Sequence, residues 1–307
     1  MNTGTTRRNF LRCMGLLASG FIIADASLIF PPSWGANTNE IKPIYTHFPD
    51  LDRIIDGFGP FELVLLAGRP FTGKTSLAVD IAVSATVDEG MPVGIFSLDW
   101  SNEGFAWDIL SRVSGVSIES MRKGTLSTTQ ISLLLDHSKI LNNAPIWIND
   151  NPDISFSEFS KIAYDLTKQH SVKLIIVDYL QLMRDWSING GVVKKLKAVA
   201  VDLGVPILLV STLPRRIDYR PDKRPRLSDL APQWKGNPQE IVEPYADIVL
   251  FTYRDRFSLQ QLRRSYLREF VAAEDTEIAE IIVAKNRHGA TGTVKLRFDE
   301  KSDKFIS

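Results

Sequence analysis

The chain has 307 residues and no net charge, since 36 Lys and Arg balance 36 Asp and Glu. Its 44% hydrophobic and 23% charged residues are typical of a globular protein, which excludes a disordered, collagen-like or coiled-coil chain. Zero net charge also excludes binding of nucleic acid through bulk positive charge, so any such contact needs a local cluster. The one cysteine, Cys13, excludes disulfides and cysteine-based zinc sites from the rest of the chain, and four scattered histidines argue against a histidine-rich metal centre.

Residues 1–36 have the composition of a targeting segment. The stretch TRRNFLR, from Thr6 to Arg12, resembles the twin-arginine export motif, and an apolar run with a small-residue site follows it at 14–26. The run is shorter than the ~20 apolar residues of a membrane span. The alternative is an N-terminal helix that docks on a neighbouring domain or subunit. We therefore expect a signal or a helix over residues 1–36, and one separate domain over residues 45–307.

Beyond about Ile44, short apolar runs alternate with helical patterns, which predicts a parallel α/β sheet. Strands are predicted at Leu63–Ala67, Val93–Leu98, Ile146–Ile148, Leu174–Val177 and Ile207–Val210, and helices at Lys74–Asp88, Asn102–Val113, Thr128–Leu141 and Ser155–Lys168. The last three runs, Ile248–Tyr253, Ile278–Val283 and Thr293–Phe298, predict a partly antiparallel edge. The segment Arg215–Glu243, rich in proline and charge, is predicted to be a long functional loop.

The strongest motif lies between the first predicted strand and helix. Gly68 to Thr75 reads GRPFTGKT and matches the phosphate-loop pattern G-x-x-x-x-G-K-[ST] in full. Its glycines let backbone N–H groups converge on phosphate oxygens, and the helix N-terminus adds a positive dipole. Lys74 supplies a point charge for the β and γ phosphates, and the Thr75 hydroxyl a ligand for Mg²⁺. The residues expected to bind ATP are Gly68, Arg69, Pro70, Phe71, Thr72, Gly73, Lys74 and Thr75.

Two acidic residues follow predicted strands and complete the expected site. Asp178 ends the apolar strand Leu174–Val177, where a carboxylate can hold Mg²⁺ through water. Asp99 follows the strand Val93–Leu98 and is the predicted general base for the attacking water, beside the phosphate loop. Glu103, one helical turn further on, is the alternative base. The alternative role for Asp99 is to cap the helix that follows it.

The stretch from about Phe48 to Ile306 resembles the motor domain of hexameric replicative DNA helicases of the DnaB type, which has a RecA-like P-loop fold. The matching segments occur in family order: Leu51-Asp52, Gly57-Phe58 and Glu62-Leu63 before the phosphate loop, FSLDWS at 96–101, VDYLQLM at 177–183, KRPRLSDL at 223–230, ADIVLFTYRD at 246–255 and AKNRHGATGTVKLRF at 284–298. The resemblance implies a mostly parallel central sheet with helices on both faces, and Mg²⁺-dependent ATP hydrolysis at the subunit interfaces of a homo-oligomeric ring.

Lys285 and Arg287 match the family's lysine and arginine fingers, which reach the γ-phosphate of the neighbouring subunit. The alternation of the two residues along the chain places their side chains on one face, as a shared role requires. An arginine finger stabilises charge in the transition state and can contribute ~10³–10⁵ in rate. The alternative is that both are solvated basic residues.

Three departures from the family pattern bear on ATP hydrolysis and on unwinding. The family's catalytic glutamate is Asp99 here, one methylene shorter, and a ~1 Å misplacement can cost ~10²-fold in rate. The γ-phosphate-sensing glutamine is replaced by Thr212, and the segment Arg184–Gly191 is shorter than the DNA-contacting loop of relatives. We expect a DNA helicase or translocase motor that acts on single-stranded DNA in replication or related DNA metabolism. The alternative is an ATP-binding assembly module that hydrolyses ATP poorly and has no helicase activity.

A basic loop and a basic helix are the predicted contacts to single-stranded DNA. The loop residues are Arg215, Arg216, Arg220, Lys223, Arg224 and Arg226, and the helix residues are Lys194, Lys195 and Lys197. Trp186 and Tyr219 are predicted to stack on bases. The alternative is a solvated basic loop.

Two further expectations concern the segment Arg254–Arg268 and the compartment. The segment is predicted to be an exposed insertion that contacts another subunit. ATP chemistry favours the cytoplasm, whereas a used twin-arginine signal at 6–26 would place the chain in the periplasm.

Overall fold

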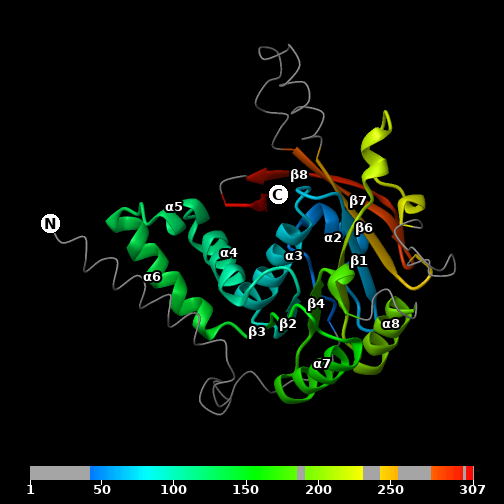
Figure 1. Ribbon diagram of the computed structural model, residues 1–307, viewed down its shortest axis with the longest axis horizontal. Helices are drawn as coiled ribbons and strands as arrows, with labels where there is room; N and C mark the ends of the chain where they lie inside the picture. The colour runs from blue at the N-terminus through cyan, green and yellow to red at the C-terminus, as the bar shows by residue number, and fades with distance from the viewer. Residues whose placement is uncertain (1–41, 185–190, 231–242, 255–277, 300–301, 307) are drawn as a thin grey trace.

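The computed structural model describes residues 42–184, 191–230, 243–254, 278–299 and 302–306, and in them the chain forms one nine-stranded sheet (Figure 1). The strands are β1 (Leu63–Gly68), β2 (Val93–Ser97), β3 (Ile146–Asn149), β4 (Leu174–Asp178), β5 (Ile207–Thr212), β6 (Ile248–Tyr253), β7 (Ile278–Asn286), β8 (Gly292–Asp299) and β9 (Lys304–Ile306). Their order is β3-β2-β4-β5-β1-β6-β7-β8-β9.

Helices cover both faces of this sheet. They are α2 (Pro49–Ile55), α3 (Lys74–Val83), α4 (Asn102–Ser114), α5 (Ile118–Lys123), α6 (Thr128–Asn143), α7 (Phe156–His170) and α8 (Val192–Leu203). One core lies between the sheet and α3, α4 and α6, and the other lies between the sheet and α7 and α8. The result is the RecA-like architecture that the family resemblance implies, with α4, α5 and α6 to one side of the sheet (Figure 1).

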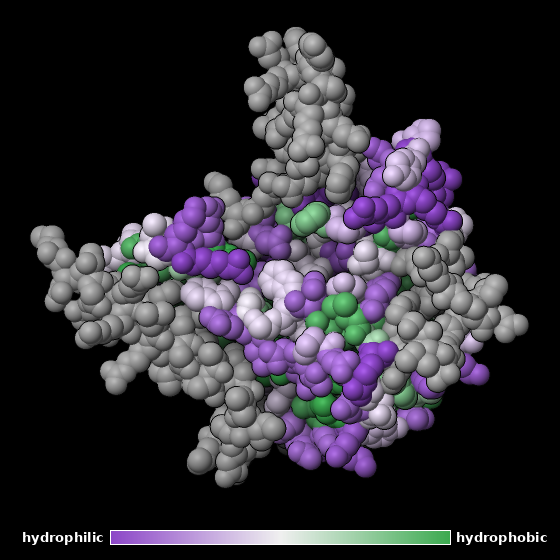
Figure 2. Space-filling model, viewed as in Figure 1, coloured by the Kyte–Doolittle hydropathy of each residue, from purple (hydrophilic) through white to green (hydrophobic). Residues whose placement is uncertain are grey.

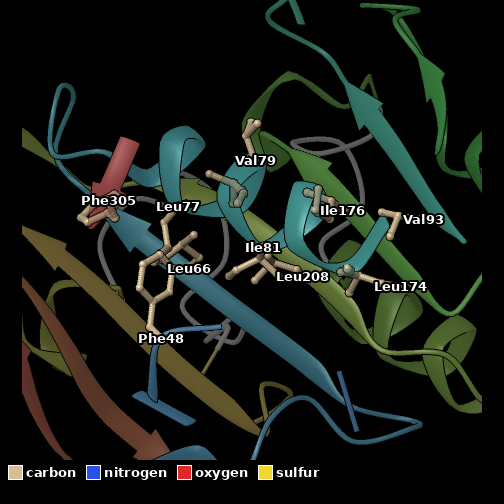
Figure 3. Close-up of a cluster of buried hydrophobic side chains, with 14 of the residues drawn as sticks. Phe48, Leu66, Leu77, Val79, Ile81, Val93, Leu174, Ile176, Leu208 and Phe305 are labelled. Carbon is tan, nitrogen blue, oxygen red and sulfur yellow. The ribbon is translucent and has the colours of Figure 1, made fainter. Parts of the chain in front are cut away.

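The central strands are apolar throughout because both of their faces are covered. All six residues of β1 are buried, and alternate residues enter opposite cores: Val64 and Leu66 join the first, Leu63 and Leu65 the second. Figure 3 shows Leu77 and Ile81 of α3 lying over Leu66 and Leu208 of the sheet. The expected central strands β4 and β5 are likewise fully or almost fully buried.

The last strands form the expected antiparallel edge. Strands β3, β2, β4, β5, β1 and β6 run parallel, whereas β6–β7, β7–β8 and β8–β9 are antiparallel pairs. The predicted helix over Lys74–Asp88 is regular only to Val83 and continues as a π-helical turn, Ser84–Asp88, in which the Thr86 hydroxyl donates to the carbonyls of Ala82 and Val83. The sequence patterns missed α2, α5 and β9, which are three to seven residues long.

Helix starts follow local sequence signals. Ser127 with Gln130 and Ser155 with Glu158 form capping boxes at α6 and α7. Within the part of the chain that the structure describes, no helix has the length and apolarity needed to cross a bilayer. Figure 2 shows that hydrophilic side chains predominate on the face drawn in Figure 1, with apolar side chains in small patches.

Candidate nucleotide-binding site

The phosphate loop lies at the carboxyl edge of the parallel strands. Gly68, the last residue of β1, is level with Thr212 of β5 and Thr252 of β6. Phe71 and Gly73 both have left-handed backbones, with φ of 65° and 89°, and they turn the chain back towards α3. Such alternation of backbone conformation is what lets consecutive N–H groups point into one concavity.

Two glycines of the loop have no room for a side chain. A Cβ on Gly68 would lie 2.3 Å from Thr252 Oγ1 and 2.6 Å from Thr72 Oγ1, and these two hydroxyls are themselves hydrogen-bonded at 2.7 Å. A Cβ on Gly73 would lie 2.7 Å from Cζ of Phe305. The loop therefore fits closely against β6 and the C-terminal strand β9, which the motif alone does not reveal.

Lys74 is the buried cation of the loop. It is only 9% exposed, and its Nζ donates to the Arg69 carbonyl at 3.0 Å. Burial lowers the pKa of Lys74 to about 8, while the nearby Asp178 carboxylate opposes that shift. Because its ammonium is buried at a helix N-terminus, Lys74 is suited to bind a polyanion, whose phosphate oxygens would replace the water that the ammonium has lost.

Thr75 and Asp178 lie together, as the sequence predicts for the metal site. Asp178 ends β4, is 5% exposed, and accepts a hydrogen bond from the Thr75 side chain. Burial, together with the neighbouring Asp99, raises the pKa of Asp178 to about 6, although Thr75 and Lys74 oppose the shift. A hydroxyl and a carboxylate are the hard oxygen ligands that Mg²⁺ prefers, so these residues fit a Mg²⁺-nucleotide.

Asp99, which follows β2, lies near Asp178 at the end of the neighbouring strand β4. Strands β4 and β5 separate β2 from β1, the strand that leads into the phosphate loop. Strands β2 and β4 are neighbours, and the Leu98 N–H donates to the Asp178 carbonyl at 2.6 Å. Asp99 itself is exposed. Its negative charge adds to the effect of burial in raising the pKa of Asp178 and of Tyr179. The alternative role of Asp99 as a helix cap is wrong, because Ser101 caps α4 by accepting from the Gly104 N–H. Glu103 lies in the first turn of α4, where its carboxylate accepts from Trp107 Nε1 at 3.4 Å.

Thr212 lies at the same edge, level with Gly68. Beside it, the Gln181 side chain donates to the Ser211 hydroxyl at 2.7 Å and accepts from the Thr212 N–H at 3.4 Å. A glutamine amide is therefore present next to the position where the family carries its own, but it comes from the segment after β4. Sequence reasoning missed Gln181, because only the β4–β5 neighbourhood brings it there.

Lys285 and Arg287 lie together at the opposite edge of the sheet. Lys285 Nζ donates to the Glu243 carbonyl, and Arg287 donates to the Pro244 carbonyl at 3.2 Å and pairs with Asp247 at 2.9 Å. Asn286, between them, is level with Ile248, which is level with Val64, four residues before Gly68. Four strand residues span about 13 Å, so both cations are far from the phosphate loop of their own subunit.

Most of the predicted DNA-binding loop is engaged in internal ion pairs. Arg216 and Arg220 pair with Asp229, Arg226 pairs with Asp222, and Arg224 forms a two-pronged pair with Glu280 of β7, with both distances 2.7 Å. Arg69 of the phosphate loop pairs with Asp218 of the same segment at 2.8 Å. These pairs anchor the loop to the phosphate loop and to β7. The sequence indicated a segment with net positive charge but not which acidic residues its arginines pair with.

Other predicted contacts lie on the surface or outside the described residues. Arg215 and Tyr219 are exposed on the loop, Lys223 is half-buried there, and Lys194 and Lys195 are exposed at the start of α8. Lys197, two residues on, instead binds Asp247 and the Phe61 carbonyl. The twin-arginine stretch, Trp186, residues 185–190 of the compact segment and residues 255–268 lie outside the described residues.

Comparisons with known proteins place this chain in a family. Residues 43–307 match the family model of the DnaB-like helicase C-terminal domain. The chain is 31% identical over 298 residues to the replicative DNA helicase DnaB of Rickettsia bellii (strain RML369-C), covering 88% of the chain and 59% of the relative. It is 33% identical over 276 residues to the replicative DNA helicase DnaB of Geobacillus stearothermophilus, covering 87% and 57%.

Two solved structures have the same fold. One is an isolated ATPase domain, which superposes with a TM-score of 0.75 at 26% identity, covering 89% of this chain and 94% of that domain. The other is a DnaB-like replicative helicase, studied for its interactions with primase, which also gives 0.75 at 26% identity, covering 87% and 62%. The chain spans a little under three fifths of the two DnaB relatives. Because the family model covers nearly all of the described residues, the chain belongs to the family of DnaB-like helicase C-terminal domains.

Proposed function

We propose that this chain is an ATP-hydrolysing motor that forms a ring and moves on single-stranded DNA in replication or related DNA metabolism. The observation that carries the proposal is the split of the charged groups between the two edges of the sheet. At the carboxyl edge, where the parallel strands end, are Lys74, Thr75, Asp178 and Asp99. At the amino edge, where those strands begin, are Lys285 and Arg287. A complete site therefore needs the carboxyl edge of one subunit and the amino edge of the next.

The residues at the carboxyl edge have defined roles in this proposal. The phosphate loop and Lys74 bind the triphosphate, and Thr75 with Asp178 would hold Mg²⁺, which neutralises charge between the β and γ phosphates when bound. Asp99 orients the attacking water and accepts its proton. Lys285 and Arg287 of the next subunit stabilise the charge that develops on the γ-phosphate.

The direct test is ATP turnover with and without single-stranded DNA. We expect turnover that DNA stimulates, and we expect Lys74→Ala to abolish it because the buried cation of the loop is removed. The folded state of the variant is checked by its thermal unfolding. Normal turnover by Lys74→Ala would contradict the proposal.

A second candidate is an ATP-binding assembly module with slow hydrolysis. It is favoured by Asp99, whose carboxylate is one methylene shorter than the family's glutamate, and by Thr212. Asp99→Glu separates the two candidates: a large gain in turnover, of about 10²-fold, would support the slow module. If the natural chain already turns over quickly and Glu adds nothing, the module interpretation fails.

We infer that the ATP chemistry places this domain where nucleotide is available, which argues for the cytoplasm and against use of the export motif at 6–26. The inferred division into residues 1–36 and 45–307 is tested by fractionation of cells that express the full chain. An uncut cytosolic product supports the cytoplasmic proposal, and a shortened periplasmic product contradicts it.

A further inference from the structure

We propose that Phe71 on the phosphate loop of one subunit packs on an apolar patch at the amino edge of the next subunit. This amino-edge patch consists of Phe61, Val201 and Gly204. The inference rests on the ring of the proposed function and goes beyond it, because it names an apolar contact that seats one subunit on the nucleotide loop of another.

Phe61 and Phe71 share two unusual properties. Phe71 is 75% exposed and Phe61 is 44% exposed, although both are large apolar side chains. Both also have left-handed backbones, with φ of 65° and 68° for Phe71 and Phe61. A bulky residue in that conformation is strained, and a solvent-exposed ring gains little from burial to offset the strain. The phosphate-loop conformation accounts for the backbone of Phe71, but it does not account for a large apolar ring left in solvent, and a contact with another surface does.

The loop presents Phe71 in a fixed position. Arg69, two residues earlier, is bound by Asp218, and the Arg254 guanidinium lies 3.5 Å from the Phe71 carbonyl oxygen. Thr72, the next residue, is buried and bonded to Thr252. The backbone on both sides of Phe71 is therefore anchored while its ring remains exposed at the carboxyl edge.

Phe61 is joined to Arg287, the proposed arginine finger, by a chain of three polar contacts. Its carbonyl accepts from Lys197 Nζ at 2.7 Å, and the same ammonium pairs with Asp247, which binds Arg287 at 2.9 Å. A Cβ on Gly204 would lie 3.4 Å from the Phe61 ring, so the ring rests on bare backbone there. Val201, one turn earlier on α8, is 47% exposed. The patch thus lies beside the group that must reach the neighbouring nucleotide.

Joining the two edges brings these apolar groups together. When Arg287 of one subunit approaches the phosphates held by the loop of the next, the amino-edge patch of the first approaches Phe71 of the second. Burial of the aromatic ring should strengthen association about 10- to 100-fold, which corresponds to about 1.4–2.8 kcal/mol. The contact is head-to-tail, so it repeats around a ring instead of ending at a dimer.

Cysteine cross-linking tests the inference on the full chain. In a Cys13→Ser background, Phe61→Cys combined with Phe71→Cys is oxidised in the presence of Mg²⁺-ATP and single-stranded DNA. We expect a ladder of covalent multimers, because each subunit links to the next. The matched control combines Phe71→Cys with Ile140→Cys, since Ile140 on α6 is also 47% exposed but is not part of the patch. Thermal unfolding of the reduced proteins checks that each variant is folded.

The outcomes separate this inference from the proposed ring. A ladder from the Phe61–Phe71 pair, absent from the Ile140 pair, supports the contact. If the native mass shows a ring but the Phe61–Phe71 pair gives no ladder, the contact is wrong and the ring stands. If the wild-type chain stays monomeric with Mg²⁺-ATP and DNA, both are wrong.

A second measurement distinguishes a neighbouring subunit from the nucleotide base as the partner of Phe71. We expect Phe71→Ala and Phe61→Ala each to weaken association at least about tenfold, and the double variant to be no weaker than either single variant. If Phe71→Ala instead weakens Mg²⁺-ATP binding at concentrations where the chain is monomeric, with association unchanged, the ring of Phe71 serves the nucleotide and the inference is overturned.

Discussion

Gly73 and Gly191 hold nearly the same backbone conformation in different surroundings. Both precede the first residue of a helix, α3 and α8, with φ of 89° and 90°. Among the described residues, a Cβ on Gly191 would meet no atom within 4 Å, whereas one on Gly73 would meet the Phe305 ring at 2.7 Å. Both positions favour glycine because of their backbone conformation. At Gly73, Phe305 of β9 adds a second, steric requirement that Gly191 does not have.

This pair gives a matched prediction about stability. We expect Gly191→Ala to lower the free energy of unfolding by about 1 kcal/mol through the left-handed backbone. Gly73→Ala should lower it by about 1–3 kcal/mol more, because the ring of Phe305 must move. Denaturant unfolding of both variants measures the difference. Equal losses would show that β9 does not press on the loop.

At the scale of elements, a buried ion cluster ties the helix after the phosphate loop to the C-terminal strand. Arg112 of α4 pairs with Asp80 of α3, with Asp108 on its own helix and with Asp303 beside β9. Asp80 also accepts the Phe305 N–H at 2.8 Å. Three carboxylates surround one guanidinium, so the cluster has excess negative charge in a buried place, where charge is costly.

The cluster predicts a pH dependence of stability. Burial raises the pKa of Asp80 and of Asp108 to about 6, although Arg112 opposes the shift. The folded protein thus holds a proton more tightly than the unfolded chain, and stability is lost as pH rises from about 4 to about 6. Asp108→Asn mimics the protonated form and does not lose this contribution. The free energy of unfolding of the variant minus that of wild type should therefore rise by about 1–3 kcal/mol as the pH is raised from 4 to 7.

Denaturant unfolding across that pH range measures the effect of Asp108→Asn. Asp136→Asn on the exposed face of α6 is the control, and its difference from wild type should stay within about 0.5 kcal/mol. A constant difference for Asp108→Asn as well would show that the cluster does not titrate in this range.

The pairing of Arg224 with Glu280 predicts which basic residues contribute to DNA binding. Lys194→Ala should reduce the log–log salt slope of single-stranded DNA binding by about 0.7, because an exposed lysine can neutralise one phosphate. Arg224→Ala should leave the slope unchanged and lower the free energy of unfolding by about 1–3 kcal/mol, since it leaves a buried carboxylate without its partner. Fluorescence titrations at several salt concentrations distinguish the two. A reduced slope for Arg224→Ala would assign it to the nucleic acid.

For the whole molecule, the decisive property of the proposed site is its division between opposite edges of one sheet. The phosphate loop follows β1, and the two proposed finger residues, Lys285 and Arg287, lie at the end of β7, about 13 Å away along the strands. Because β6 and β7 are antiparallel, the end of β7 lies at the beginning of β6. Under the proposed assignment of roles, a second copy of the chain is needed to bring both halves of the site together.

Mixed assemblies test this division. Lys74→Ala and Arg287→Ala should each be inactive alone, the latter reduced by about 10³-fold or more. In an equal mixture, about a quarter of the interfaces combine an intact loop with intact fingers, and turnover should recover to about that share of wild type. ATP turnover of the mixture, with each variant alone as control, measures the recovery. An inactive mixture would mean that both groups act within one subunit.

The sequence by itself determined the phosphate loop, the acid after the apolar strand and the alternation of strands and helices. These depend on residues adjacent in the chain: Gly73 with Lys74, and Asp178 after four apolar residues. Short apolar runs also predicted the central strands, because a strand that is buried on both faces has an unbroken apolar run such as Leu174–Val177.

Only the tertiary structure decided which distant residues share a surface. Thr252 and Phe305 line the phosphate loop, and Gln181 reaches the end of β5, from strands and turns far away in the chain. Arg224 was predicted to bind DNA, yet it is paired with Glu280, 56 residues later. Strand order and register determine which of these residues come into contact. The identity of a basic or aromatic residue does not reveal its partner on a distant strand.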